Sequence, residues 1–171
     1  MMIHEVVSEI NEALASGLEA EGVTNVVYYG ICDSAIVNRK NSQKAFPALF
    51  DVKGEGIYPF SDDLYDLGWY HRLISNKYLT DNKSFGRTRG RITESDMYLV
   101  VWGFAKALEK SKYETEEIIR KSFLDTVLLQ QTVFDGVQIF NREFRGYKYL
   151  IRPEEFVFSI QYKVRYRNGR C

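Results

Sequence analysis

Residues 96–104 read D-M-Y-L-V-V-W-G-F and carry apolar side chains at nearly every position. In an extended chain, alternate side chains point to opposite sides, so Tyr98 and Trp102 share one face while Leu99 and Val101 share the other. Both faces are then apolar, which is typical of a strand covered on both sides in the middle of a sheet. The aromatic and β-branched residues of this run favour a strand over a buried helix.

A second periodic run closes the chain at residues 156–167. Its apolar members recur at every second position: Phe156, Phe158, Ile160, Tyr162, Val164 and Tyr166. The intervening residues become polar and then basic, ending in Lys163, Arg165 and Arg167. This alternation predicts a long strand with one packed face and one polar face. Because polar faces of sheets usually meet water, antiparallel pairing is predicted.

Two segments show the period of an amphipathic helix. The first carries an apolar stripe with spacings of three and four residues: Ile3, Val7, Ile10, Leu14 and Leu18. Gly22 is expected to cap the end of this helix. The second helix is predicted at about residues 114–130. Ser111 and Glu114 form a capping-box pattern, and Thr115, which precedes two glutamates, is an equally good start.

The remaining pattern predicts shorter strands between these elements. Residues 24–31, T-N-V-V-Y-Y-G-I, are apolar on both faces and predict a second interior strand. Residues 33–44 are polar and predict a surface connection. Residues 46–52 and 57–60 flank K-G-E-G and predict a hairpin, because glycine permits the positive φ of a tight turn.

Further strands are predicted on both sides of the central one. Residues 68–79 alternate imperfectly, which predicts a strand with a break near Ser75 and Asn76. Residues 134–140 and 147–151 are each expected to form a short strand.

This order of elements predicts an α+β domain, with a mainly antiparallel sheet and two helices packed on it. The chain of 171 residues is long enough for one such domain with a sizeable core, so residues 1–171 are assigned to a single domain. Residues at about 80–91 combine glycine, serine and asparagine with basic side chains and predict a mobile tip.

The formal net charge is zero, but the charges are unevenly placed along the chain. Residues 1–70 hold four Lys or Arg against eleven Asp or Glu, whereas residues 71–171 hold nineteen against twelve. A globally basic nucleic-acid binder is therefore disfavoured. If the two halves form separate surfaces, their opposite charges predict head-to-tail self-association.

Basic side chains gather in the tip and at the end of the last strand. Basic residues interleaved with glycine can contact phosphate, although a solvated tip is the simpler interpretation. These residues form the candidate interaction surface of the chain: Lys83, Arg87, Arg89, Arg91, Lys163, Arg165 and Arg167.

No catalytic, cofactor-binding or metal-binding motif is present in the sequence. His4 has no second histidine or cysteine at ligand spacing, and the sequence around Cys32 lacks the glycines of a nucleophile elbow. His71 is expected near the surface of a strand, where it could serve as a general base but needs no such role. We therefore expect a non-enzyme without catalytic residues, metal or cofactor.

The acidic cluster Asp62, Asp63 and Asp66 does not have the spacing of an EF-hand loop and predicts a solvated turn. Cys32 and Cys171 lie far apart in sequence and are expected to be free thiols. Because no apolar run approaches 20 residues and the N-terminus lacks the pattern of a signal peptide, we expect an intracellular protein without a membrane partner.

The order of elements resembles that of the tail-terminator and neck (head–tail joining) proteins of tailed bacteriophages. The resemblance rests on the N-terminal helix, the strand pair with a long hairpin, the second helix and the final strand F-S-I-Q-Y-K-V-R-Y-R. It implies a non-catalytic structural subunit that forms a ring, typically a hexamer, and that contacts other virion proteins near DNA. It also implies a location in the virion, or in the host cytoplasm during assembly.

Two alternatives come from the residues themselves. The first is a small-ligand-binding domain or enzyme with an aromatic pocket, lined by Tyr28, Tyr29, Trp69, Tyr70 and His71. The second is a nucleic-acid binder that uses the basic tip. Aromatic residues at 15% of the chain can equally well belong to a core.

Overall fold

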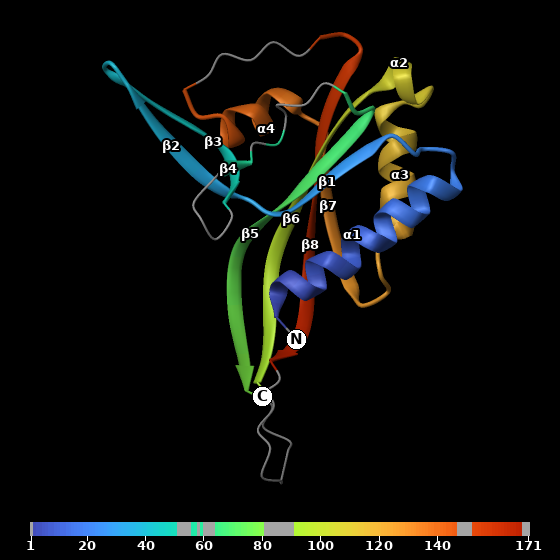
Figure 1. The fold of residues 1–171 in the computed structure, drawn as a ribbon. Coiled ribbons are helices and arrows are strands. Elements are labelled where there is room, and N and C mark those ends of the chain that lie inside the picture. The colour runs from blue at the N-terminus through green and yellow to red at the C-terminus, as the bar shows by residue number, and fades with distance from the viewer. Residues whose placement is uncertain are drawn as a thin grey trace.

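A five-stranded sheet forms the centre of the protein in the computed structural model, which describes residues 2–50, 56–57, 59, 64–80, 91–146 and 152–168 (Figure 1). The strand order is β1-β5-β6-β8-β7, and only the β1–β5 pair is parallel among these neighbours. The strands are β1 (Val26–Ile31), β5 (Leu67–Thr80), β6 (Arg91–Phe104), β7 (Val127–Val133) and β8 (Glu155–Asn168). The predicted α+β class with a mainly antiparallel sheet is confirmed.

The predicted central strand is the middle strand of this sheet. β6 lies between β5 and β8 and pairs with both over nearly its whole length. Leu99 and Val101 are buried against one face of the sheet, and Val100 and Trp102 are buried against the other. Two-sided burial is therefore the reason for the two-sided apolar pattern.

Two helices cover one face of the sheet. The helices α1 (Ile3–Ala20) and α3 (Lys112–Ser122) contact each other and pack on this face, with the short helix α2 (Ala105–Leu108) before α3. Gly22 follows α1 with a φ of +81°, which confirms its predicted capping role. Ser111 accepts a hydrogen bond from the Glu114 amide, and Glu114 accepts one from the Ser111 amide, so the predicted capping box is also confirmed.

The helix α4 (Gly136–Glu143) covers the opposite face of the sheet. Its apolar residues Ile139 and Phe140 belong to the same buried cluster as Tyr70 and Trp102. The prediction of a strand at 134–140 was therefore wrong. Asp135 accepts a hydrogen bond from the Gln138 amide and so begins a helix where the apolar pattern alone suggested a strand.

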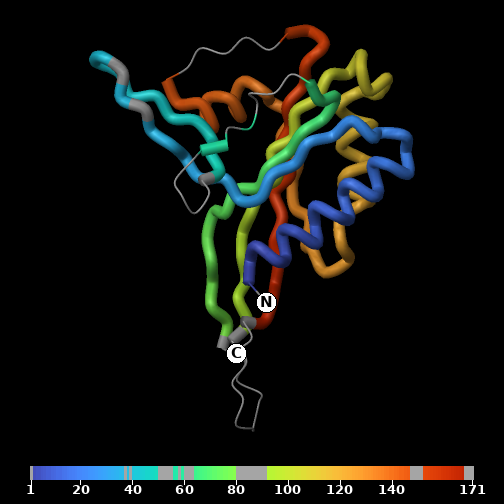
Figure 2. Tube along the Cα trace, viewed as in Figure 1, coloured from blue at the N-terminus to red at the C-terminus, as the bar shows by residue number. Residues whose placement is uncertain are grey.

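A small three-stranded sheet stands beside the large one. Its order is β2-β3-β4, with β2 (Asp33–Arg39), β3 (Ser42–Phe50) and β4 (Gly56–Ile57). The trace in Figure 2 shows the β2–β3 hairpin extending away from the body of the molecule. The prediction of a surface connection at 33–44 was wrong, because these polar residues form most of the hairpin. The predicted pairing across K-G-E-G is confirmed where Leu49 meets Ile57.

The second predicted helix ends earlier than expected. It stops at Ser122, and Phe123 has the extended ψ of 148°, so the prediction of a helix to about 130 was wrong. Residues 127–133 instead pair with β8 as an edge strand. This pairing satisfies backbone groups along β8 that a continued helix would leave without a partner.

The other strand predictions are largely confirmed. β5 contains an irregularity between Leu73 and Ser75, next to the predicted break, and β8 pairs antiparallel with both of its neighbours. β1 is an edge strand and not an interior one. It is apolar because α1 packs against it and because Tyr29 reaches the cluster on the other face. The predicted tip at about 80–91 falls mainly on residues 81–90, and these and the predicted strand at 147–151 lie outside the described residues.

Candidate interaction surface

Asn11, Trp69, His71 and Tyr162 form a buried polar network beneath α1. Trp69 Nε1 donates to Asn11 Oδ1 at 2.7 Å, and His71 Nε2 lies 2.8 Å from the same oxygen. His71 Nδ1 lies 2.6 Å from the Tyr162 hydroxyl. Because an indole nitrogen can only donate, Asn11 Oδ1 is an acceptor, and His71 Nε2 must carry the ring proton. Burial keeps the imidazole neutral, so Nδ1 carries no proton and accepts from the Tyr162 hydroxyl.

The burial of His71 corrects the expectation of a histidine near the surface. Burial lowers the pKa of His71 to about 3, because no water compensates the charged ring. Both ring nitrogens are bonded to protein groups, so the side chain has no free base to offer a substrate. Its role in this structure is to join α1, β5 and β8.

The neutral His71 predicts a pH-dependent stability. In the unfolded chain the imidazole binds a proton near pH 6.5, whereas the folded protein resists protonation down to about pH 3. The contribution of His71 to the free energy of unfolding is therefore fully present above about pH 6.5. It is lost progressively as the pH falls from there toward about pH 3. We expect the free energy of unfolding to drop by about 1.4 kcal/mol between pH 7.5 and 5.5.

Denaturant unfolding at the two pH values measures this drop, in a His4→Gln background that leaves His71 as the single histidine. A folded-state NMR titration of His71 with a midpoint near pH 6.5 would contradict the expected result.

The residues of the predicted aromatic pocket do not share one face of the sheet. Trp69 and His71 point toward α1, whereas Tyr70 points to the opposite cluster. Tyr28 stacks on Trp69 with ring centroids 5.1 Å apart, and Tyr29 stacks on Trp102. These side chains make contacts within the chain on two faces of the sheet and do not come together around a cavity.

The carboxylate of Glu143, on α4, is the centre of a second buried network. Its Oε2 accepts from the Tyr70 hydroxyl at 2.7 Å and from Arg72 Nε at 2.8 Å. Its Oε1 accepts from the Tyr98 hydroxyl at 2.8 Å and from Arg142 Nε at 3.0 Å. Four donors therefore compensate a carboxylate that is almost completely buried.

These contacts decide the ionisation of the network. Burial alone raises the pKa of Glu143, but the Arg72 charge and the hydrogen bonds from Tyr70, Arg72 and Tyr98 outweigh it, so the pKa lies below its ordinary value. Burial, reinforced by the Glu143 carboxylate, raises the pKa of Tyr98 to about 12. Burial also raises the pKa of Cys32 to about 12, which makes this free thiol unreactive at neutral pH.

Arg72 fixes the point at which β1 leaves the sheet. Its Nη1 donates to the carbonyl oxygen of Cys32 at 2.9 Å, directly after the last β1 contact, in which the Cys32 amide donates to the His71 carbonyl. The chain then turns into β2 and the hairpin. The Arg72–Glu143 pair consequently anchors α4, the start of the hairpin and the middle of β5 to one another.

From Arg72 to the end of β5, the outer edge of this strand is uncovered. β1 pairs with β5 only as far as His71, and within the described residues no strand pairs with the outer edge of residues 72–80 (Figure 1). All six residues at 73–78 are exposed. The side chain of Ile74 is 50% exposed and that of Tyr78 is 66% exposed. Lys77 is the single charge in residues 73–80. Soluble proteins normally protect such an edge, so this one is a candidate site for strand pairing with another chain.

The other edge of the sheet is formed by β7. It is the last strand in the order, and it exposes Leu128. Following the register across β8 and β6 places Val127 level with Asn76 and Thr132 level with His71. The free part of β5 and the strand β7 therefore overlap in height at opposite ends of one sheet.

The predicted basic surface is only partly available. Lys163 Nζ lies 3.2 Å from Asp96 Oδ1, and Arg165 Nε lies 2.6 Å from Glu94 Oε2, so both cations are paired with the neighbouring strand. Lys83, Arg87 and Arg89 lie outside the described residues, as does the side chain of Arg91. Arg167 is exposed on β8, and it also makes an interaction within the chain.

The acidic surface predicted from the first half of the chain does form on α1. The helix and its cap carry exposed glutamates without a lysine or arginine between them: Glu5, Glu9, Glu12, Glu19 and Glu21. The charge asymmetry of the sequence therefore becomes an acidic helix, but its basic counterpart on β8 is largely neutralised within the chain.

Comparison of the chain with models of protein families finds no match, and comparison with curated proteins finds no significant match. In the part of the chain that the structure describes, no group of three or more His, Cys, Asp or Glu side chains is placed to hold a metal ion. No described helix is both long and apolar enough to cross a membrane.

The sequence did not predict the free edge of β5. The free edge of β5 depends on where β1 stops, and that point is set by Arg72, which contacts Glu143 from 71 positions away. The sequence offered one local signal, because residues 73–78 are the least regular part of the predicted strand at 68–79. A strand that is exposed on both faces needs no alternation of apolar and polar residues.

Proposed function

We propose that this protein is a non-catalytic structural subunit that assembles head to tail into a ring, of the kind formed by tail-terminator and head–tail joining proteins of tailed bacteriophages. The observation that carries the assembly proposal is the uncovered edge of β5 at residues 72–80, with Ile74 and Tyr78 exposed. The assignment to phage virions rests on the resemblance in element order. Such a subunit would act in the virion, or in the host cytoplasm during assembly, beside other virion proteins and near DNA.

The strand directions favour joining the two different edges of the sheet. β5, β6, β8 and β7 are successive antiparallel neighbours, so β5 and β7 run in opposite directions. A rotation about an axis along the strands keeps these directions and heights. It would therefore bring β7 of one copy antiparallel to the free part of β5 of the next copy. A contact between two different surfaces closes into a ring when the rotation permits.

Strand edges are a better candidate for this contact than charge alone. Lys163 and Arg165 are already paired within the chain, so they have little charge left to attract the acidic α1 of a neighbour. Backbone hydrogen bonds along a free edge, together with exposed apolar side chains, supply both affinity and register. The charge asymmetry would then contribute mainly to orientation during encounter.

A charge on the free edge tests the proposal. Tyr78→Lys places a second lysine on the exposed part of β5, and Val137→Lys adds the same charge on α4, where the side chain is similarly exposed at 62% against 66%. We expect Tyr78→Lys to raise the concentration needed for assembly about tenfold or more, because lysines on an edge oppose strand pairing. Val137→Lys should assemble as the wild type does. Sedimentation velocity measures both.

A mixing experiment separates a ring from a two-fold dimer. Leu128→Lys blocks the β7 edge and leaves the β5 edge intact, whereas Tyr78→Lys does the reverse. In a head-to-tail assembly each variant alone stays monomeric, and their mixture forms a dimer through the two intact edges. If Leu128→Lys assembles normally, or if Tyr78→Lys and Val137→Lys behave alike, the proposed contact is wrong.

A further inference from the structure

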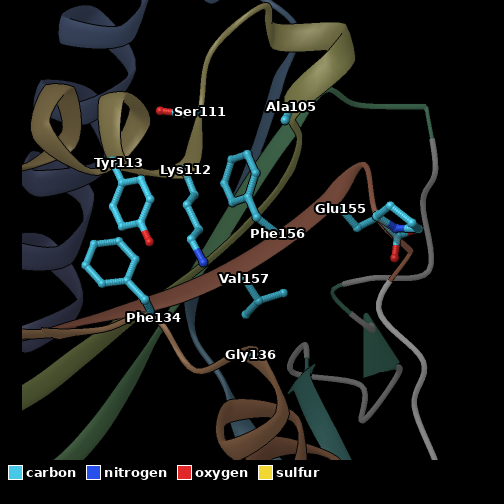
Figure 3. Close-up of a pocket in the computed structure, with 10 residues that line it drawn as sticks. Ala105, Ser111, Lys112, Tyr113, Phe134, Gly136, Glu155, Phe156 and Val157 are labelled. Atoms are coloured by element: carbon cyan, nitrogen blue, oxygen red, sulfur yellow. The ribbon is translucent and has the colours of Figure 1, made fainter.

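A hollow of about 400 Å³ lies where the first turns of α3 and α4 meet the beginning of β8 (Figure 3). Its walls include Tyr113, Phe134, Phe156 and Val157, and Lys112 extends across it. This volume falls in the range of small-molecule sites, which are mostly apolar with a few polar groups. The residues that line the hollow do not include the exposed residues of the β5 edge.

The aromatic wall of the hollow is fixed by the core. The Phe134 ring packs 5.0 Å from Tyr113 and 5.9 Å from Phe158, measured between ring centroids. Phe156 stacks on Phe158 at 5.9 Å. Phe158 is completely buried and packs against both Phe134 and Phe156, the two rings that line the hollow, so the positions of these rings are fixed by the core.

Lys112 brings a positive charge into this apolar hollow. Its Nζ lies 5.2 Å from the centre of the Tyr113 ring and 5.9 Å from that of Phe134. Figure 3 shows the side chain running between Phe134 and Phe156 toward Val157. Cation–π contacts of this kind hold an ammonium group in place without neutralising its charge.

The nearby carboxylates are already occupied. Glu155 pairs with Arg152 at 3.1 Å, and Glu114 accepts the Ser111 amide as part of the capping box. Among the described residues, no salt bridge joins Lys112 to a carboxylate. Lys112 is also the first residue of α3, where cations are disfavoured because the helix dipole has the same sign. The charge of Lys112 is therefore left for an external anion.

We propose that this hollow binds a small aromatic carboxylate. The single ammonium group of Lys112 is suited to one carboxylate, and the fixed faces of Phe134 and Phe156 are suited to one aromatic body above Val157. An ammonium–carboxylate hydrogen bond in an apolar surround is stronger than a neutral one. Binding therefore depends on both the charge of the ligand and the charge of residue 112.

The test uses 2-naphthoate and its neutral amide, 2-naphthamide, as probes in isothermal titration calorimetry. Lys112→Met keeps the aliphatic stem and removes the charge, and Lys106→Met removes an exposed lysine of α2 as the matched control. We expect saturable binding of 2-naphthoate, about tenfold weaker binding to Lys112→Met, and no change for Lys106→Met. The amide should bind the wild type and Lys112→Met equally weakly.

NMR shifts of the Val157 methyl groups locate the bound probe, and Lys112→Arg should retain binding of 2-naphthoate. The proposal is overturned if 2-naphthoate does not saturate, if Lys112→Met binds it as well as Lys106→Met does, or if the shifts fall away from Val157.

Discussion

Replacing Glu143 with alanine is expected to destabilise the protein by about 3–5 kcal/mol, because the change leaves the Arg72 guanidinium buried without its partner carboxylate. The hydroxyls of Tyr70 and Tyr98 lose their acceptor in the same step. This loss is a large fraction of the roughly 5–15 kcal/mol by which domains are stable. Denaturant unfolding, followed by circular dichroism, measures it.

The matched control is Glu117→Ala, which removes an exposed carboxylate that pairs with Lys121 at 2.7 Å. Exposed pairs contribute about 0–1 kcal/mol, so this variant should unfold almost as the wild type does. Replacing the buried pair by Arg72→Met with Glu143→Leu should recover part of the loss, since no unpaired charge remains. A Glu143→Ala variant as stable as Glu117→Ala would contradict the role assigned to this network.

Trp102→Ala is expected to cost about 3–5 kcal/mol, the usual range for deleting a buried tryptophan. The side chain is 7% exposed, and its ring centroid lies 6.4 Å from that of Tyr29 and 6.0 Å from that of Tyr70. The indole also fills the space over Gly68, where an added Cβ would lie 2.2 Å from Trp102 Cζ2. No single neighbour can move in to fill such a cavity.

Tyr78→Ala is the control for this variant, because it removes an aromatic ring that is mostly exposed on β5. Its free energy of unfolding should change by less than about 0.5 kcal/mol. An unchanged denaturant midpoint for Trp102→Ala would show that β6 is not the central strand of the sheet.

The elements that the sequence predicted correctly are those in which burial follows a regular repeat along the element. The stripe of α1 and the alternation of β8 follow directly from one buried face, and the doubly apolar run of β6 follows from two. The capping box at Ser111, one of the two helix starts that the sequence allowed, is the observed start of α3. In each case a local pattern of residues was enough, because burial repeats with the period of the element.

The wrong predictions concern segments whose apolar pattern fits both a helix and a strand. In these segments, tertiary contacts determine which of the two forms. Residues 123–130 carry apolar side chains at spacings that fit a helix, but Val127 and Leu129 pair with β8 instead. Residues 134–140 alternate enough for a strand, yet Asp135 caps a helix that places Glu143 opposite Arg72. An apolar pattern cannot show which edge of a sheet lacks a partner.

The candidate surface was beyond prediction for the same reason. Its free edge begins at Arg72, where the long-range contacts of Glu143 and Cys32 direct β1 out of the sheet. The ion pairs of Lys163 and Arg165 depend on the register between β6 and β8. Residue type alone indicated basic side chains there, but not that Glu94 and Asp96 lie opposite them.

Multi-angle light scattering during gel filtration of the wild-type protein measures whether the chain assembles into a ring. We expect one species at high protein concentration, with a mass that is a fixed multiple, greater than two, of the 19.9 kDa chain. A closed head-to-tail ring stops growing at that multiple. A mass that stays at 19.9 kDa at every concentration, or that stops at a dimer, would contradict assembly into a ring.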